Sequence, residues 1–299
     1  MIDIGRALES ERIMKALTGM SPSEFEGIVP VFGDILKEEA FGKSRERYPG
    51  GGRKHTLGTP EEKLFYALFY IRVYPTFDVA AFFFGADRSQ ACRWAHTFLP
   101  ILEKTLGREL VLPARKVVSP AEFMRLFPEV GEVFIDGTER PVRRSADNDK
   151  QREDYSGKKK RHTRKNIVVN DSEKRVIILT PTEPGRKHDY NIFKESGVGE
   201  SLPPGTKTNV DLGFQGIEKD FPDADTSIPH KKPRGGELTP EQRTENRSIS
   251  SHRVISEHTI CGIKRLKSLT DIYRNTTQDF DDRLINIGCG IWNYHLKAA

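Results

Sequence analysis

The spacing of apolar residues along the chain changes near residue 130. Residues 59–107 are rich in Phe, Leu and Ala and carry them at helical spacing. Beyond residue 130 the apolar residues come in short β-branched or aromatic runs bounded by turn residues, at 133–135, 167–169 and 176–179. Such runs are typical of strands. The pattern therefore predicts a helical first part followed by a mixed α/β domain.

Four places carry the same helix-start signal, a hydroxyl residue followed by proline and, three residues after the hydroxyl, by Glu or Gln. These starts lie at Ser21, Thr59, Ser119 and Thr239. The hydroxyl accepts a hydrogen bond from a backbone N–H of the first turn, and the Glu or Gln reaches back to the N–H of the capping residue. We predict four helices here, the last running from Pro240 to about Leu269.

The short apolar runs predict a small sheet. Turn residues 170–172 separate the second and third runs, so these two runs are predicted to pair as a hairpin. Residues 209–211 look like the end of a further strand, and residues 226–228 are a candidate for a fifth.

Composition permits an anionic partner without requiring one. The 299 residues include 48 Lys and Arg against 43 Asp and Glu, a net charge of +5. Three scattered cysteines form no C-x-x-C pair, which disfavours a disulfide framework or a zinc site. We see no signal peptide and no apolar segment of the ~20 residues that a membrane span needs. We expect a soluble, cytoplasmic, nucleoid-associated protein.

Residues 77–99 fit a helix-turn-helix, whose second helix is predicted to end at Phe98, with Gly85 at the turn because glycine adopts a left-handed backbone without strain. Four side chains of the second helix face outward and could contact base edges or phosphates in a major groove. These are Arg88, Ser89, Gln90 and Arg93. The same residues also fit a plain helix bundle whose polar face contacts only water.

Two aspartates follow apolar runs and precede a glycine. Asp136 comes directly before Gly137, and Asp211 stands two residues before Gly213. We expect each carboxylate at the end of a strand, where the glycine lets a ligand approach the backbone. Two such aspartates on neighbouring strands could share a hard divalent cation. Taken singly, each could instead simply start a turn.

The predicted last helix offers a third carboxylate between two cations. Arg253, Glu257 and Lys264 have offsets of 0, 4 and 11 residues, which fall within roughly 40° at about 100° per residue. Apolar residues occupy the opposite side and predict the packed face: Ile255, Ile263, Leu266 and Leu269. Ordinary charge pairing on a solvated helix would give the same pattern.

Phosphodiester chemistry explains these residue types. Two Mg²⁺ ions, for which Mn²⁺ can substitute, held ~4 Å apart by Asp136, Asp211 and Glu257 could activate a water or a 3′-hydroxyl and stabilise the leaving oxygen. Without metals the like charges would raise the pKa values of the carboxyls. Arg253 and Lys264 would hold phosphates on either side.

The densest basic stretch runs from Lys150 to Lys165 and includes four consecutive cations, Lys158, Lys159, Lys160 and Arg161. We interpret it as a loop that grips duplex DNA, although a solvated charged loop is the alternative. His188 and Asp189 form a polar pair before a predicted short helix. They could orient the metal site, or Asp189 could cap that helix.

Taken in order, these residues resemble the DDE transposases of bacterial insertion sequences, in the branch related to Harbinger-type elements. The matching blocks are residues 134–138, 156–163, 184–189, 210–216 and 246–264, and residues 59–94 resemble the family's DNA-binding module. The resemblance implies a ribonuclease H-like fold, a two-metal site and cut-and-paste movement of DNA. It carries the catalytic triad onto Asp136, Asp211 and Glu257. Where relatives often have tyrosine, this chain has Ser250.

Three parts are therefore predicted: a helical lead-in and linker at 1–57, with Gly50–Gly52 as the linker, a helix-turn-helix DNA-binding domain at 58–112, and a ribonuclease H-like catalytic domain at 113–299. Alternatives are a DNA-binding protein that has lost catalysis and a nuclease that cleaves without strand transfer. Because transposition brings two element ends together, we expect double-stranded DNA as the partner and at least a homodimer.

Overall fold

The computed structural model describes residues 2–41 and 56–298, so the predicted linker at Gly50–Gly52 lies outside the described residues. The chain divides into two compact units. The helical unit comprises Met1–Leu112, Lys264–Asp271 and Arg283–Ala299, and the sheet unit comprises Pro113–Ile263 and Ile272–Asp282. Both this division and the predicted one change at residue 113, but the two C-terminal segments cluster with the helices. Within the described ranges, no helix has the length and apolar character of a membrane span.

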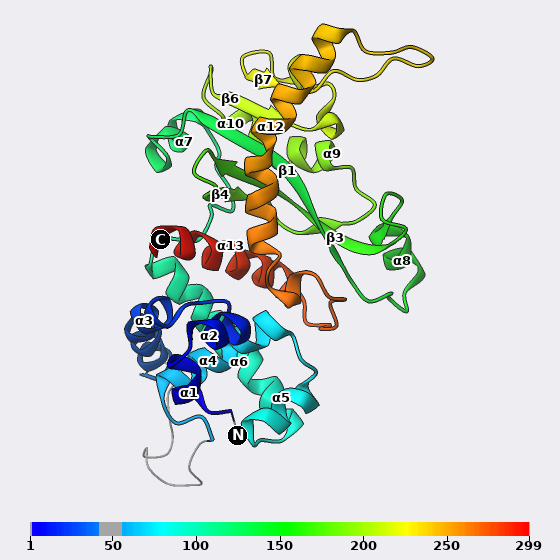
Figure 1. The fold of residues 1–299 in the computed structure, drawn as a ribbon. Helices are drawn as coiled ribbons and strands as arrows, with labels where there is room; N and C mark the ends of the chain where they lie inside the picture. Colours follow the sequence, from blue (N-terminus) through cyan, green and yellow to red (C-terminus); the bar gives the residue numbers. More distant parts are fainter. Residues whose placement is uncertain (1, 42–55, 299) are drawn as a thin grey trace. The chain divides into compact units, whose positions relative to one another are not determined.

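The helical unit is built from helices that pack on an aromatic core. Its helices are α1 (Ile4–Leu8), α2 (Glu11–Thr18), α3 (Pro22–Phe41), α4 (Pro60–Val73), α5 (Phe77–Phe84), α6 (Arg88–Arg108), η2 (Lys267–Leu269) and most of α13 (Phe280–Ala298) (Figure 1). The buried ring of Tyr66 lies 5.0 Å from that of Phe84 and 5.2 Å from that of Trp94, edge to face. This cluster joins α4 to both helices of the helix-turn-helix.

All four predicted helix starts are confirmed. Helices α3, α4, α7 (Pro120–Leu126) and α12 (Pro240–Ile263) each begin at the proline of the signal. In α4 the Glu62 N–H donates to Thr59 Oγ1 at 3.2 Å and the Glu62 carboxylate accepts from the Thr59 N–H at 3.0 Å.

The predicted end of α12 near Leu269 is wrong, because the helix stops at Ile263. The backbone then turns, and Leu266 and Leu269 are buried next to and within η2. The side chain of Arg72 donates to the Arg265 carbonyl. The Arg265 carbonyl therefore accepts a hydrogen bond within the helical unit, and it does not need the backbone N–H that a further helical turn would supply.

A mixed sheet forms the centre of the sheet unit. Strand β1 (Glu132–Pro141) pairs antiparallel with β3 (Arg161–Asp171) and parallel with β6 (Lys207–Val210), which pairs parallel with β7 (Asp225–Ser227). The outer edge of β3 carries β4 (Val176–Leu179), β5 (Glu183–Pro184) and β2 (Tyr155–Ser156) in turn. The predicted β3–β4 hairpin and the strands at 209–211 and 226–228 are confirmed. This is the expected ribonuclease H-like arrangement.

Helices cover this sheet and position its polar edge. They are α7, α8 (Asn148–Asp154), α9 (Asp189–Glu195), α10 (Val198–Ser201), η1 (Leu212–Phe214), α11 (Ile217–Asp220) and α12. Side chains alternate along β1, so Val133 and Ile135 enter the core that includes Phe193 and Phe214. Phe134 and Asp136 point to the other face, where α12 packs on β1 (Figure 1).

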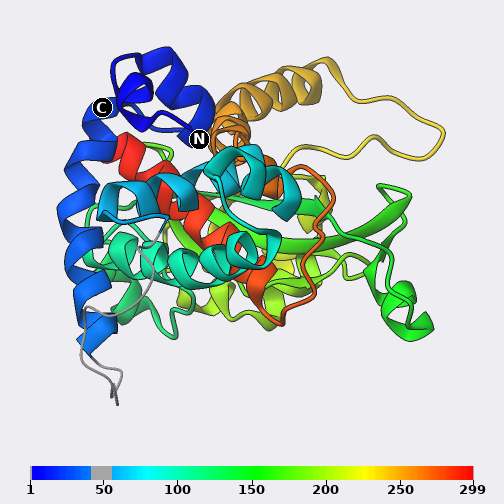
Figure 2. The same cartoon turned by 90° about the horizontal axis from the view of Figure 1, so that it is seen from below.

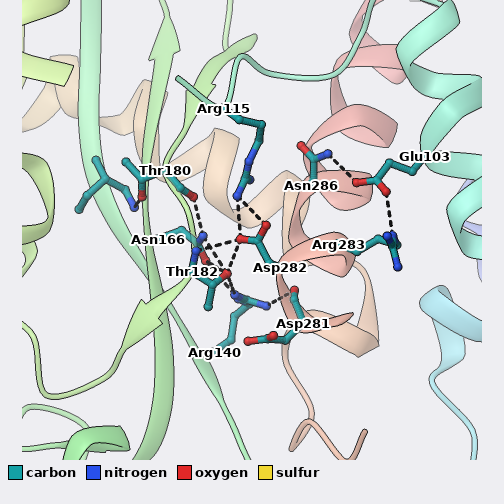
Figure 3. A network of polar contacts seen from close by, with 11 residues as sticks. Glu103, Arg115, Arg140, Asn166, Thr180, Thr182, Asp281, Asp282, Arg283 and Asn286 are labelled. Carbon is teal, nitrogen blue, oxygen red and sulfur yellow. Dashed lines mark hydrogen bonds and ion pairs between the residues drawn. The ribbon is translucent and has the colours of Figure 1, made fainter. Parts of the chain in front are cut away.

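A polar network in the sheet unit holds the first turn of α13, at Asp281 and Asp282 (Figure 3). The Asp282 carboxylate accepts from Arg115 Nη2 at 2.7 Å and from the N–H of Thr182 at 2.8 Å. Arg140, whose side chain is buried, donates to Asn166 Oδ1 and to the Asp281 carbonyl, each at 2.8 Å. These hydrogen bonds tie the first turn of α13 to the sheet, and buried hydrogen bonds of this kind are costly to leave unmade.

Candidate active site

The apolar run before Asp136 had suggested that this residue stands at the end of a strand. In the structure Asp136 lies inside the strand. Strand β1 continues to Pro141, and Asp136 is paired with Val168 of β3. What ends at Ile135 is the pairing with β6, whose last residue is Val210. Asp211, which follows directly, therefore emerges on the strand next to Asp136. The two aspartates therefore lie where the parallel pairing of β1 with β6 ends, and β1 itself continues beyond that point.

The two aspartates are held in the same way by the backbone that follows them. One oxygen of Asp136 accepts from the N–H of Gly137 at 2.7 Å. One oxygen of Asp211 accepts from the N–H of Gly213 at 2.8 Å, which makes Asp211 the N-cap of η1. Each hydrogen bond fixes one oxygen of a carboxylate, and the second oxygen of Asp136 faces the Arg253 guanidinium.

The electrostatics of the pair favour a cation. Burial, followed by the negative charge of Asp211, raises the pKa of Asp136 to about 6. The Arg253 guanidinium and the Gly137 N–H act in the opposite direction without cancelling this effect. A carboxyl with a raised pKa beside a second carboxylate is typical of a functional site, where a bound cation would favour the ionised form.

A third carboxylate, Asp189, lies against the backbone of the same strand. A Cβ atom at Gly137 would stand 2.8 Å from the carboxyl carbon of Asp189, so the space that glycine leaves is filled by this side chain. Asp189 Oδ1 lies 3.0 Å from Nζ of the buried Lys165, which also donates to the Lys187 carbonyl. Lys165 and Asp189 therefore form an ion pair beside Asp136, in which the charge of each side chain is balanced by that of the other.

The idea that Asp189 caps helix α9 is wrong. The N-cap is His188, whose Nδ1 accepts from the Tyr190 N–H at 3.3 Å, and Asp189 is the first helical residue. Because His188 makes the cap with its exposed side chain, the Asp189 carboxylate points to Lys165 and Gly137 instead.

The three residues predicted to share a face of the last helix have different surroundings. Arg253 is half-buried, with its guanidinium 3.9 Å from Asp136 Oδ2. Glu257, one turn further along α12, is exposed. Lys264 follows the last helical residue and belongs to the helical unit. Within the described ranges, no three or more His, Cys, Asp and Glu side chains converge into a group that could hold a metal.

The helix-turn-helix has the predicted elements. Helix α5 begins after Thr76 and ends at Gly85, whose φ of 63° is left-handed, and α6 begins at Arg88. This second helix continues past the predicted end at Phe98, through Pro100, to Arg108. Arg88, Ser89 and Arg93 are exposed and Gln90 is half-buried.

The four predicted basic residues are exposed: Lys158, Lys159 and Lys160 lie on the turn between β2 and β3, and Arg161 is the first residue of β3. Two backbone N–H groups close this turn: that of Lys159 donates to Ser156 Oγ and that of Lys160 to the Ser156 carbonyl. The cations therefore project from a short, hydrogen-bonded turn.

Comparison with known proteins identifies the family. Residues 135–293 match the family described as DDE superfamily endonuclease, and this match covers more than half of the chain. The chain belongs to the DDE endonuclease superfamily. Residues 55–108 match the helix-turn-helix of the same superfamily, so both predicted modules are confirmed. The relation to Harbinger-type elements stays a prediction.

One curated relative of this DDE endonuclease extends over nearly the whole chain. It is named "Probable transposase for insertion sequence element IS702", from Microchaete diplosiphon, and is 31% identical over 287 residues that cover 95% of each protein. No solved structure matches the chain.

Sequence reasoning missed the surroundings of Tyr155. This exposed tyrosine lies in a surface cavity with several arginines. Its position three residues before Lys158 was a usable signal, because an aromatic residue beside a basic run is common in nucleic-acid-binding proteins.

Proposed function

We propose that the chain is a transposase, which binds the ends of a mobile DNA element, cleaves phosphodiester bonds there and joins the resulting 3′-hydroxyls to target DNA. Support comes from the pairing of a helix-turn-helix with a DDE endonuclease domain. The name of the relative that shares 95% of the chain supports the same function. The working complex would be a homodimer or larger.

The observation that carries the proposal is the placement of Asp136 and Asp211 on adjacent parallel strands. Each is fixed through one oxygen by the N–H of a nearby glycine. Burial and the neighbouring charge penalise ionisation of Asp136, and a cation would remove that penalty. The donors are carboxylate oxygens, which hard divalent ions prefer. The residues therefore fit a magnesium site.

Asp136, Asp211 and Glu257 would hold the ions, and we propose two of them. Bound Mg²⁺, or Mn²⁺ in its place, would supply Lewis acidity at the scissile phosphate and a lower pKa for the attacking water or 3′-hydroxyl. Glu257 is close along α12 to Arg253, which already reaches Asp136. As the exposed member of the set, Glu257 is the ligand that has to approach when the site is filled.

The remaining residues would bind and orient DNA. Arg253 is placed to neutralise a phosphate next to Asp136, and Lys264 is proposed for a phosphate further along. Asp189, paired with Lys165, would act as a positioning residue. Its carboxylate occupies the space over Gly137 and so fixes the backbone that orients Asp136. His188 would support it by capping α9.

Base and phosphate recognition would be divided between the two modules. Ser89, Gln90 and Arg93 would read the element ends in a major groove, and Arg88 would contact a phosphate beside them. Lys158, Lys159, Lys160 and Arg161 would grip the backbone of the duplex without reading its sequence. This division predicts that the sheet unit alone binds DNA in a salt-sensitive way but without preference for the ends.

A cleavage assay on the DNA that flanks the gene tests the proposal. We expect the full chain to nick that DNA in Mg²⁺, and Asp136→Asn, Asp211→Asn and Glu257→Gln each to lower the rate at least ~10²-fold while DNA binding persists. Asp223→Asn and Glu218→Gln are matched controls at exposed positions and should cleave normally. Binding without cleavage by the wild type would indicate a DNA-binding protein that has lost catalysis. Cleavage without joined products would indicate a nuclease.

A further inference from the structure

An arm of the sheet unit carries a cavity that the proposed cleavage site does not use. The arm consists of residues 142–162, with α8 and β2, and projects from the rest of the sheet unit in both views (Figure 1, Figure 2). The cavity has a volume of about 960 Å³, at the upper end of the range for pockets that hold small ligands. Its lining includes Arg144, Asn148, Gln151, Arg152, Tyr155 and Arg186.

The lining combines an aromatic ring with positive charge. Tyr155 is 43% exposed, and its ring meets that of His162 in an edge-to-face arrangement with the centroids 5.7 Å apart. Three arginines surround it, and among the described residues that line the cavity there is no carboxylate. Arg144 Nε donates to Gln151 Oε1 at 2.7 Å, which orients both side chains. The ligand implied is anionic and has a flat ring.

The base of the arm is held firmly, so the cavity has a fixed wall. The buried carboxylate of Asp154 pairs with Arg164 Nε at 2.9 Å. The N–H of Arg186 donates to the Glu153 carbonyl at 2.9 Å. A Cβ atom at Gly185 would lie 2.1 Å from Thr163 Oγ1 and 2.7 Å from the Asp154 carbonyl, so this contact admits no side chain. Arg186 is therefore locked beside the arm by its own backbone.

The cavity lies on the strand that pairs with Asp136. Val168 is the partner of Asp136 on β3, and His162 stands six residues earlier on the same strand. At about 3.3 Å per residue, that separation is about 20 Å. DNA bound at Asp136 could therefore reach the cavity, since that distance corresponds to roughly six nucleotides at about 3.4 Å each along one strand.

We propose that this cavity binds an unpaired nucleotide of the DNA substrate. The base stacks on the ring of Tyr155. Its edge forms hydrogen bonds with Asn148 and Gln151, and the arginines hold its phosphates. Stacking requires a base that is free of its duplex partner, because paired bases present only their edges. The turn between β2 and β3, with its exposed lysines, would contact the DNA backbone on either side of this nucleotide. This inference rests on the proposed function only in taking DNA as the substrate.

The test compares two tails on one duplex. The full chain is titrated with a duplex that carries a four-nucleotide thymine tail and with the same duplex carrying an abasic tail, which keeps the phosphates but lacks the bases. We expect the thymine tail to bind about 5- to 150-fold more tightly, the range that stacking of one base supplies. Tyr155→Ala should abolish this difference, whereas Tyr155→Phe should retain it.

Lys158→Ala is the matched control, because Lys158 is exposed close to Tyr155 in sequence but does not line the cavity. It should weaken binding to both tails equally. Equal affinity of the wild type for both tails would overturn the proposal, as would a preference that survives Tyr155→Ala in a variant with wild-type melting temperature. A preference for the thymine tail in a chain that cannot cleave DNA would overturn the proposed function and leave the cavity assignment standing.

Discussion

Arg253 of α12 lies with its guanidinium 3.9 Å from the carboxylate of Asp136, on the face of β1 where Phe134 contacts His252 of the same helix. The helix thus brings a cation to the aspartate whose pKa is raised by burial and by Asp211. We infer that Arg253 compensates this charge until a divalent ion and a phosphate arrive. Its two roles, counter-charge and phosphate ligand, can be separated by experiment.

Replacing Arg253 with alanine should raise the affinity of the protein for Mn²⁺ several-fold, because a competing positive charge is removed from the carboxylates. Cleavage should nevertheless fall, since a phosphate contact is lost. Isothermal titration of Mn²⁺ and single-turnover cleavage on the same preparation measure both effects. Arg247→Ala, at an exposed position on the same helix, is the control and should change neither. An unchanged or lower Mn²⁺ affinity in Arg253→Ala contradicts the counter-charge role.

Replacing Lys165 with methionine should destabilise the sheet unit by about 3–5 kcal/mol, the usual cost of leaving one member of a buried ion pair without its partner. The side chains of Lys165 and Asp189 are only 9% and 21% exposed, so water compensates little. Urea unfolding provides the measurement. The double variant Lys165→Met with Asp189→Asn should recover part of the loss. Additive losses in the double variant would show that the two residues act independently.

Local signals in the sequence predicted the elements, and contacts between distant residues decided their limits. The capping motifs at Ser21 and Thr59 need only four residues each, so their helices begin as predicted. By contrast, β1 continues past Asp136 because β3, some thirty residues later, supplies hydrogen-bonding partners to Pro141. Polar residues such as Thr138 and Arg140 belong to this strand, although they are not part of the apolar run that predicted it.

The C-terminal helix shows the same limit. The predicted catalytic domain ran to residue 299, whereas Arg283–Ala299 cluster with the helical unit. In the helical unit, Glu103 accepts from Arg283 and from Asn286, each at 2.8 Å (Figure 3). Nothing in the sequence around Glu103 identifies those partners 180 residues away. The sequence indicated which carboxylates form the candidate triad. Only the fold shows that Arg253 and Asp189 lie close to Asp136.

Glu24 should make the helical unit sensitive to acid. Burial raises the pKa of this carboxyl, but hydrogen bonds from Ser21 and from the His295 side chain outweigh burial, so the pKa lies below its ordinary value of about 4.5. A lowered pKa contributes stability that is present above the unfolded pKa and is lost as the pH falls through the folded pKa. Between about pH 5 and pH 3 the wild type should therefore lose more stability than Glu24→Gln.

Thermal melts at pH 7, 5 and 3.5 check this expectation. Glu24→Gln should melt lower than the wild type at pH 7, and the difference should shrink at pH 3.5. Glu26→Gln changes an exposed carboxylate two residues away and serves as the control. A gap between Glu24→Gln and the wild type that stays constant with pH would contradict the ionic contribution.

Two exposed arginines at the start of α6 should have different roles in DNA recognition. Arg93 Nη2 donates to Gln90 Oε1 at 3.0 Å, so the two side chains are oriented together one turn into the helix. Arg88 instead lies 3.6 Å from Asp78 of α5, at the first position of α6. Arg93→Ala should therefore reduce discrimination between element ends and scrambled DNA by about 1–3 kcal/mol, the value of a bidentate base contact. Arg88→Ala should weaken both DNAs alike and lower the slope of log K against log salt by about one contact.

Salt titrations with both DNAs measure these two effects on the same variants. Gln90→Ala should reproduce part of the loss in Arg93→Ala, because it removes the group that orients the guanidinium, and the double variant should lose less than the sum. Arg108→Ala, at the far end of α6, is the control because that side chain is paired with Glu38. If Arg93→Ala weakened both DNAs equally, Arg93 would be a phosphate contact. Recognition of the ends would then fall to Ser89 and Gln90, whose shorter side chains require a closer approach of α6 to the groove.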